Sequence, residues 1–271
     1  MNLKHWTAFF LVTGYSLSAL SSLAADKYSS VADIPTPEGY DRVPVPAGTF
    51  AASLRDLELS DRKELLAGDG VTVLCDDEKV AVTEIEPFAN KHDVGVDGIV
   101  RLWGDYLWNT GGRAQISFPL DNGQVATWKD WRDGLRPSAK GGRFIFMQTN
   151  TPDGSHGSYQ NFLSFVAEEM GAISLRRESR TIFEDSVTVG DLLVALKKDT
   201  ESSVGIILDA CKGPFGERLF LLGTCGTPST SLYIMRPYSP VQGLGDWFTL
   251  EGAQYAIGHG SRTDLRRVTL K

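Results

Sequence analysis

Apolar positions recur at helical spacing in two long stretches of the chain. In residues 93–108 they are three or four residues apart, and Gly111-Gly112 follows as a stop signal. Residues 155–170 repeat this pattern, with a glycine directly after them. We therefore expect two long amphipathic helices, and the same reasoning predicts shorter helical segments at residues 49–57 and 128–134.

The last third of the chain has the short apolar runs that are typical of strands. We expect strands at residues 192–196, 204–209, 219–222, 232–235 and 247–250. Earlier in the chain, residues 71–74 and 80–85 read as a hairpin that turns at residues 76–78, and residues 114–118 as one short strand. Because helices come first and strands follow, the order favours an α+β fold with a mostly antiparallel sheet over an alternating α/β fold.

The N-terminus has the pattern of an export signal. Lys4 precedes a run of apolar and small residues, and Ser22 and Ala24 are small residues at the positions that a signal peptidase reads. We predict cleavage after Ala24, with Ala25 as the alternative site, and a periplasmic or secreted protein. Beyond this segment, nothing approaches the ~20 consecutive apolar residues that cross a bilayer, so we expect no membrane span after signal removal.

The composition along the chain indicates its segments, and the net charge indicates which partners to expect. We expect a signal peptide at residues 1–24, an extended polar and proline-rich lead-in at 25–42, and a single α+β domain at 43–271. The formal net charge is −7 and the basic residues are scattered along the chain. This charge excludes nucleic acid as an expected partner.

Three cysteines, Cys75, Cys211 and Cys225, leave the disulfide state open. A hairpin around its central Gly-Pro-Phe-Gly turn places Cys211 opposite Arg218 and Cys225 opposite Val204. The two cysteines are then offset from each other along the hairpin, and their Cα atoms lie much farther apart than a disulfide allows. Three small buried thiols are the favoured interpretation.

The histidines predict no metal site and no cofactor. His92 lies just before the first long helix and reads as a solvated loop residue, His156 as an exposed residue at a helix start, and His259 as part of a turn. The chain has no His-x-x-x-His or Cys-x-x-Cys spacing, which argues against structural or catalytic zinc.

One segment resembles papain-like cell-wall hydrolases of the NlpC/P60 kind. Gly190-Asp191-Leu192 is followed by Ser203-Val204-Gly205-Ile206, where the hydrolases have a Gly-Asp-Leu strand and then a strand that opens with the catalytic histidine. Ser203 occupies the histidine position. A serine hydroxyl has no useful basicity near neutral pH and cannot deprotonate a cysteine.

An ordered set of segments across nearly the whole mature chain resembles a family of exported bacterial proteins catalogued as a domain of unknown function (4846). These segments are Arg101-Leu102-Trp103-Gly104-Asp105-Tyr106-Leu107, Trp131-Arg132-Asp133-Gly134, Ser158-Tyr159-Gln160-Asn161-Phe162, Gly190-Asp191, Leu219-Phe220-Leu221-Leu222 and Asp264-Leu265-Arg266-Arg267. The resemblance implies a cysteine at the start of the first long helix. That position falls on Gly95 in the register of this family and on Val96 in that of the NlpC/P60 hydrolases. A polar position on the strand after the histidine falls on Thr224.

The resemblance implies a papain-like core with an N-terminal extension and a degenerate cleft that contains no catalytic residue. The candidate cleft positions are Gly95, Val96, Asp97, Ser203 and Thr224. We expect a non-catalytic binding or scaffolding role in the cell envelope, toward a peptide, glycan or protein. Two alternatives remain. One is a cysteine amidase or peptidase that acts on cell-wall or peptide substrates through a displaced thiol, and the other is a structural or interaction domain of different topology.

Overall fold

The computed structural model describes residues 28–62, 64–67, 69–74, 79–88, 95–196, 202–226, 230–238 and 241–268. Its elements follow in the order η1 (Val31–Asp33), β1 (Asp41–Arg42), α1 (Phe50–Arg55), β2 (Lys79–Val82), α2 (Val96–Asn109), η2 (Arg113–Gln115), β3 (Ser117–Pro119), β4 (Val125–Thr127), α3 (Trp128–Arg132), β5 (Leu135–Lys140), β6 (Arg143–Gln148), α4 (His156–Glu169), α5 (Ala172–Glu178), β7 (Arg180–Thr181), η3 (Glu184–Ser186), β8 (Leu192–Ala195), β9 (Ser203–Lys212), β10 (Arg218–Thr224), β11 (Tyr233–Met235), α6 (Leu250–Gly258) and β12 (Asp264–Arg267).

Eight strands form one sheet, and every strand pairing among the described residues is antiparallel. The order across the sheet is β2-β11-β10-β9-β8-β12-β7, and β1 pairs with the last residues of β9. The strands β8, β9 and β10 follow one another along the chain and pair as neighbours, so they form a meander at the centre. The expected α+β class with a mostly antiparallel sheet is confirmed.

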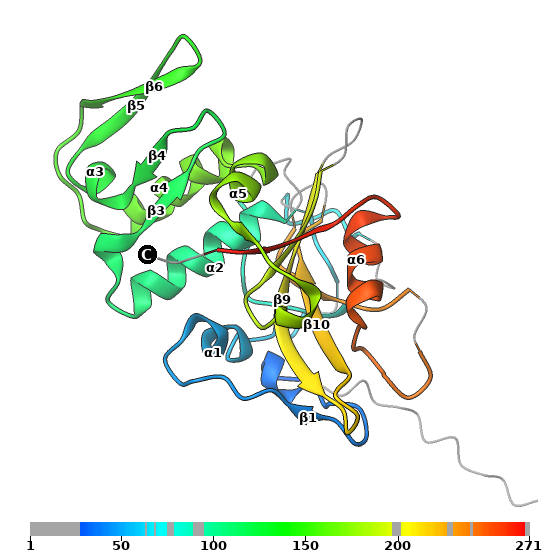
Figure 1. Cartoon of the computed structure of the whole chain (residues 1–271). Coiled ribbons are helices and arrows are strands. Elements are labelled where there is room, and N and C mark those ends of the chain that lie inside the picture. Colours follow the sequence, from blue (N-terminus) through cyan, green and yellow to red (C-terminus); the bar gives the residue numbers. More distant parts are fainter. Residues whose placement is uncertain are drawn as a thin grey trace, which may run out of the picture.

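Helices α2 and α6 cover opposite faces of this meander (Figure 1). Successive residues of a strand point to opposite faces. A side chain built at Gly95, before α2, would meet Val204 of β9, whereas one built at Gly205 would meet Ile257 of α6. Because both faces are covered, every residue of β9 before Lys212 is buried.

A smaller lobe lies beside the sheet and consists of α3, α4 and the hairpins β3–β4 and β5–β6 (Figure 1). Aromatic rings hold it together. Trp131 stacks on Phe165 with ring centroids 5.6 Å apart, and Trp128 meets Tyr159 edge to face at 5.7 Å. Trp108 of α2 stacks on the same tyrosine at 4.2 Å, which joins the lobe to α2.

A buried ion cluster attaches the N-terminal residues to β9. The Asp209 side chain is fully buried, with Arg42 Nε 2.7 Å from its Oδ2 and Arg55 Nε 2.6 Å from its Oδ1. The Arg42 guanidinium also donates to the carbonyls of Ala32 and Ile34. Residues 28–42, the described part of the expected lead-in, thus contain η1 and β1 and are fixed to the sheet by charge-assisted hydrogen bonds.

The four helical segments that the hydrophobic pattern predicts are all confirmed. They correspond to α1, α2, α3 and α4, and three of them begin at a side-chain cap. The hydroxyls of Thr49, Thr127 and Ser155 each accept a hydrogen bond from the backbone N–H three residues later. Such caps satisfy amide groups that the first helical turn leaves without partners, which is why the helices begin at these residues.

The expected hairpin of residues 71–74 and 80–85 is wrong. Val73 bridges to Leu66 instead, and β2 pairs with β11, more than a hundred residues away in sequence. The expected turn at 76–78 lies outside the described residues. An alternating pattern identifies a strand but not its partner, since any edge with a complementary face can accept it.

The expected strand at 247–250 is also wrong. Only Phe248 bridges to a strand residue, Phe220, while the hydroxyl of Thr249 accepts from the Gly252 N–H and caps α6. The predicted strand at 114–118 is shorter than expected, because residues 113–115 form η2 and β3 begins at Ser117.

The hairpin register that carries two of the cysteines differs from the expected one. Cys211 pairs with Leu219 and not with Arg218, and a bulge between Leu221 and Leu222 shifts the later pairs. Cys211 and Cys225 are buried free thiols, so the expectation that no bridge joins them is confirmed. In the part of the chain that the structure describes, no helix is both long and apolar enough to span a membrane.

Candidate functional site

The structure brings the five expected cleft positions together at one junction between α2 and the sheet. Gly95 is the N-cap of α2 and has a φ of 88°. A Cβ built on it would lie 2.0 Å from the Val204 carbonyl oxygen, which is far inside van der Waals contact. The helix therefore starts directly against the strand that begins with Ser203, and only a glycine fits there.

Thr224 completes this helix–strand junction from the neighbouring strand. Its hydroxyl donates to the Val204 carbonyl over 2.7 Å. Ser203 and Thr224 are 8% and 5% exposed, and Val96 and Asp97 are 1% exposed. The junction, defined by Gly95, Val96, Asp97, Ser203 and Thr224, is packed shut by backbone and side-chain contacts.

The two described thiols lie in environments that oppose ionisation. Burial, followed by the charge of Asp209, raises the pKa of Cys211 to about 12. Burial, followed by the charge of Asp97, raises the pKa of Cys225 as well. A nucleophilic cysteine needs the opposite, a thiolate stabilised near neutral pH by positive charge. Cys75 lies outside the described residues.

The described histidines lie on elements other than α2, β9 and β10, which form the junction. His156 is the first residue of α4, is exposed, and lies against Trp108 with ring centroids 5.6 Å apart. His259 adopts the left-handed conformation that ends α6, as the expected turn requires. His92 lies outside the described residues. Among the residues that the structure describes, no group of three His, Cys, Asp or Glu side chains is arranged to hold a metal ion.

The segments that carry the family resemblance meet one another in the fold. The Tyr159 hydroxyl of α4 donates to Asp105 Oδ1 of α2 over 3.0 Å, and Arg101 of α2 donates to Gln160 of α4. Gly104 makes this approach possible, because a Cβ there would lie 2.5 Å from the Tyr159 hydroxyl. The two segments thus form a polar contact between the long helices.

A second pair of segments is joined by an ion pair. Asp191, which follows Gly190, accepts from Arg267 Nε and Nη2, each over 2.5 Å. The Asp191 side chain is 3% exposed, so this bidentate contact fixes β12 to the turn before β8. The residues that carry the resemblance therefore include contacts that hold the fold together.

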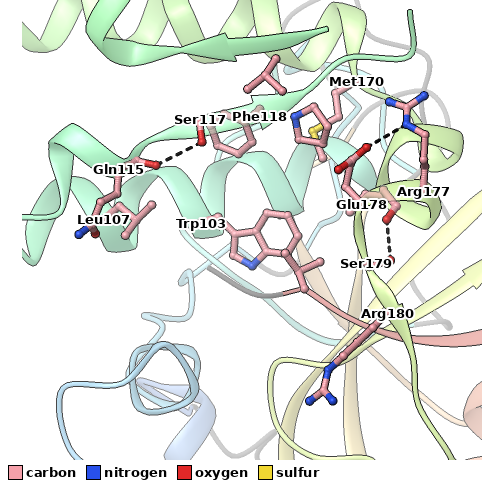
Figure 2. A pocket seen from close by; sticks show the side chains of 14 residues that line it. Trp103, Leu107, Gln115, Ser117, Phe118, Met170, Arg177, Glu178, Ser179 and Arg180 are labelled. Atoms are coloured by element: carbon pink, nitrogen blue, oxygen red, sulfur yellow. Dashed lines mark hydrogen bonds and ion pairs between the residues drawn. The ribbon is translucent and has the colours of Figure 1, made fainter. Parts of the chain in front are cut away.

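An open pocket of about 580 Å³ lies elsewhere, between α2, the β3–β4 hairpin, α5 and the edge strand β7 (Figure 2). Its lining residues are Trp103, Leu107, Gln115, Ser117, Phe118, Pro119, Val125, Met170, Leu175, Arg177, Glu178, Ser179, Arg180 and Val268. We call this the Trp103 pocket, because the indole of Trp103 lies at the centre of the lining side chains in Figure 2.

The sequence did not predict the Trp103 pocket, and it shares no residue with the helix–strand junction. One signal was present, namely the run Arg176-Arg177-Glu178-Ser179-Arg180, which concentrates charge in a chain whose basic residues are otherwise scattered. Its location beside apolar residues from four other segments follows only from the tertiary fold.

These observations define an α+β protein with a central antiparallel meander, a closed helix–strand junction and a separate open pocket. The family model described as domain of unknown function (4846) matches residues 31–260, so the chain belongs to this family. The match covers every strand of the sheet except β12, the smaller lobe, and the Trp103 pocket except for Val268. No curated protein and no solved structure is significantly similar to the chain.

Proposed function

We propose that this protein has a non-catalytic binding or scaffolding role in the cell envelope, on a papain-like core that has lost its Cys–His pair. The observation that carries the proposal is the chemistry of the helix–strand junction. Gly95, Val96 and Ser203 stand where the nucleophile and base would be, and none of them can provide a thiolate or an imidazole.

The arrangement around the junction supports the papain-like core. In papain-like enzymes the thiol lies at a helix N-terminus, where the helix dipole lowers its pKa, and the imidazole comes from a strand that faces it. Here α2 begins against Val204, beside Ser203, on the β8–β9–β10 meander. A side chain larger than hydrogen does not fit at Gly95. A single substitution at this position would therefore not easily restore a nucleophile, which supports loss of the site.

The rival function, a hydrolase with a displaced thiol, makes the opposite prediction for Cys211 and Cys225. The test uses the mature protein with Cys75→Ser, so that only these two thiols remain, and 5,5′-dithiobis(2-nitrobenzoate) at neutral pH. We expect slow labelling in buffer and fast labelling in urea, because both thiols are buried and have raised pKa values.

Single variants locate any reactive thiol. Cys211→Ala and Cys225→Ala, each in the Cys75→Ser background, leave one thiol apiece. Fast labelling of either variant in buffer, with retained native circular dichroism, would contradict the non-catalytic role. The same rate for both variants in urea is the control that the probe reaches each sulfur.

The export signal and the envelope location are part of this proposal. The weakly basic start at Lys4 and the small residues Ser22 and Ala24 support them. N-terminal sequencing of the protein from the envelope fraction should give Ala25 or Asp26 as the first residue. Recovery of the chain with Met1 from the cytoplasm alone would exclude export.

A further inference from the structure

We propose that the Trp103 pocket binds a small amphipathic anion, with its apolar tail against the Trp103 wall and its anionic head at Arg180. This inference rests on the proposed binding role and names the class of ligand. It requires an apolar cavity of suitable size, a cation at its edge whose charge is not already compensated, and access for the ligand.

The apolar wall is built from five side chains of four segments. Trp103 and Leu107 come from α2, Phe118 from β3, Met170 from the end of α4 and Leu175 from α5, and each is buried. Their burial fixes the wall before a ligand arrives, so little conformational entropy is lost on binding. The volume of about 580 Å³ lies within the roughly 300–1,000 Å³ of small-molecule sites.

The tail has room beyond this pocket. A neighbouring hollow of about 600 Å³ shares Leu107 and Gln115 with the Trp103 pocket and continues toward Phe50 and Tyr106. A chain that lies along Trp103 can therefore pass Leu107 without leaving a concave surface. An extended aliphatic tail suits such a path better than a compact ring system.

Three of the four arginines around the pocket have partners. Arg176 pairs with Asp264 over 2.6 Å, and Arg177 pairs with Glu178 over 3.0 Å and donates to the Leu120 carbonyl over 2.8 Å. Arg266 donates to Ser179 and to Thr181. Arg176 and Arg266 connect α5, β7 and β12, and Arg177 connects α5 to Leu120, so the donors of these three side chains already have acceptors.

Arg180 differs from these three. Within the described part of the chain its guanidinium has no ion pair and no hydrogen bond, and it is exposed at the pocket edge. The charge of Glu178 is balanced by Arg177, so Arg180 leaves the pocket with one net positive charge. A guanidinium at this position favours a carboxylate or phosphate, which it binds through paired N–H donors.

The test is isothermal titration calorimetry of the mature protein with decanoate, below its micellar concentration. We expect saturable binding of one decanoate per chain. Two comparison ligands separate the parts of the proposal, since decyltrimethylammonium has the tail with the opposite charge and acetate has the head without the tail. Neither of these two ligands should bind at concentrations at which decanoate saturates the protein.

Two charge-matched variants locate the head. Arg180→Gln should weaken decanoate binding by about tenfold, because it removes a hydrogen-bonded charge. Arg143→Gln removes an exposed arginine of the β5–β6 hairpin that does not line the pocket, and it should leave the affinity unchanged. Native circular dichroism of both variants shows that any loss of binding is local.

Several outcomes would overturn the inference: absence of saturable decanoate binding, equal binding of decyltrimethylammonium, or equal losses in the two arginine variants. Binding only to anionic lipid vesicles would overturn it too, since the proposal commits to a free ligand. These results are separate from the thiol test, because fast thiol labelling together with decanoate binding would remove the non-catalytic role and leave the ligand class standing.

Discussion

The two ends of helix α2 meet the rest of the molecule in opposite ways. At its start, Gly95 touches the backbone of Val204 and the expected catalytic positions are packed shut. Two to three turns later, Trp103 and Leu107 of the same helix face the open Trp103 pocket. In this protein, the helix end at which the sequence resemblance places a nucleophile is packed, and the open pocket lies farther along the helix.

Side-chain size explains the difference. Gly95 and Gly98 have no Cβ, so the first turn of α2 approaches β9 and Cys225 closely. Trp103 and Leu107 are large side chains that, although themselves buried, border the open pocket together with the β3–β4 hairpin and α5. Four variants test this comparison, and we describe them from the largest expected effect to the smallest.

Gly95→Ala should destabilise the protein most. Its Cβ would clash with the Val204 carbonyl oxygen, and a φ of 88° disfavours any L side chain, so we expect a loss of about 3 kcal/mol or more in the free energy of unfolding. The matched control is Gly111→Ala, with a φ of 85° and nothing within 4 Å of its Cβ, for which about 1–2 kcal/mol is expected. Urea denaturation measures both, and equal losses would mean that the junction is not closed.

Gly98→Ala should cost about 1 kcal/mol, because a Cβ there would lie 2.7 Å from Cys225 Sγ and the clash exceeds the gain in helix propensity. In a Cys225→Ala background the same change should become neutral or stabilising. The double-mutant cycle from urea unfolding should therefore show clear coupling between the two sites.

Gly157→Ala is the control for the preceding variant. It is also in a helix, α4, but its Cβ would have only the Ser155 hydroxyl nearby, at 3.9 Å. Here the gain in helix propensity should prevail and stabilise the protein by up to about 1 kcal/mol.

In the double-mutant cycle, additive effects of Gly98→Ala and Cys225→Ala on the free energy of unfolding would contradict close packing of α2 on Cys225.

Asp105, between the two ends of α2, should give the protein a characteristic pH dependence. Burial raises the pKa of its carboxyl, although the Tyr159 hydroxyl and Arg101 oppose this rise. The folded state then holds this proton to higher pH than the unfolded state does. Stability from this group is therefore greatest below the unfolded pKa of about 3.9 and is lost as pH rises through the folded pKa.

Asp105→Asn should remove this loss, and free energies of unfolding at a series of pH values would show it. Asp133→Asn is the control of opposite sign, because Lys129 and then Arg132 lower the pKa of that exposed carboxyl. The Asp133 carboxylate therefore stabilises the folded state above its unfolded pKa, and this stabilisation is lost as pH falls through its folded pKa. The same pH profile for both variants would rule out the burial effect at Asp105.

Ser117→Trp should have the smallest effect on stability. Ser117 is exposed and lines the Trp103 pocket, so the added ring enters open space, and we expect a change within about 0.5 kcal/mol by urea denaturation. The same variant should block the pocket and abolish decanoate binding. A large loss of stability would mean that the pocket is already filled by packing.

Local patterns in the sequence predicted the helices and the β9–β10 hairpin well, and the partner of β2 wrongly. Thr49 and Ser155 cap helices with their own neighbours, so these helix starts depend on interactions within a few residues. β2, by contrast, pairs with β11 rather than with residues 71–74, because any strand with a complementary face can serve as partner. The β5–β6 hairpin and α5 were not predicted. A signal for β6 was present in the apolar run Phe144-Ile145-Phe146-Met147, whereas β5 is mostly polar and α5 is short and ends in charged residues.

The sequence by itself determined the periodicity of the helices and the α+β order of the elements. It also placed a glycine and a serine at the junction, so no thiolate and no imidazole can form at these two positions. These are properties of single residues or of short windows, which persist in any fold. Only the tertiary structure decided that Gly95 lies against Val204, that both described thiols are buried, and that Arg180 and Trp103 line the same pocket. Each of these facts joins segments far apart in sequence, and such contacts arise only when the whole chain has closed around its core.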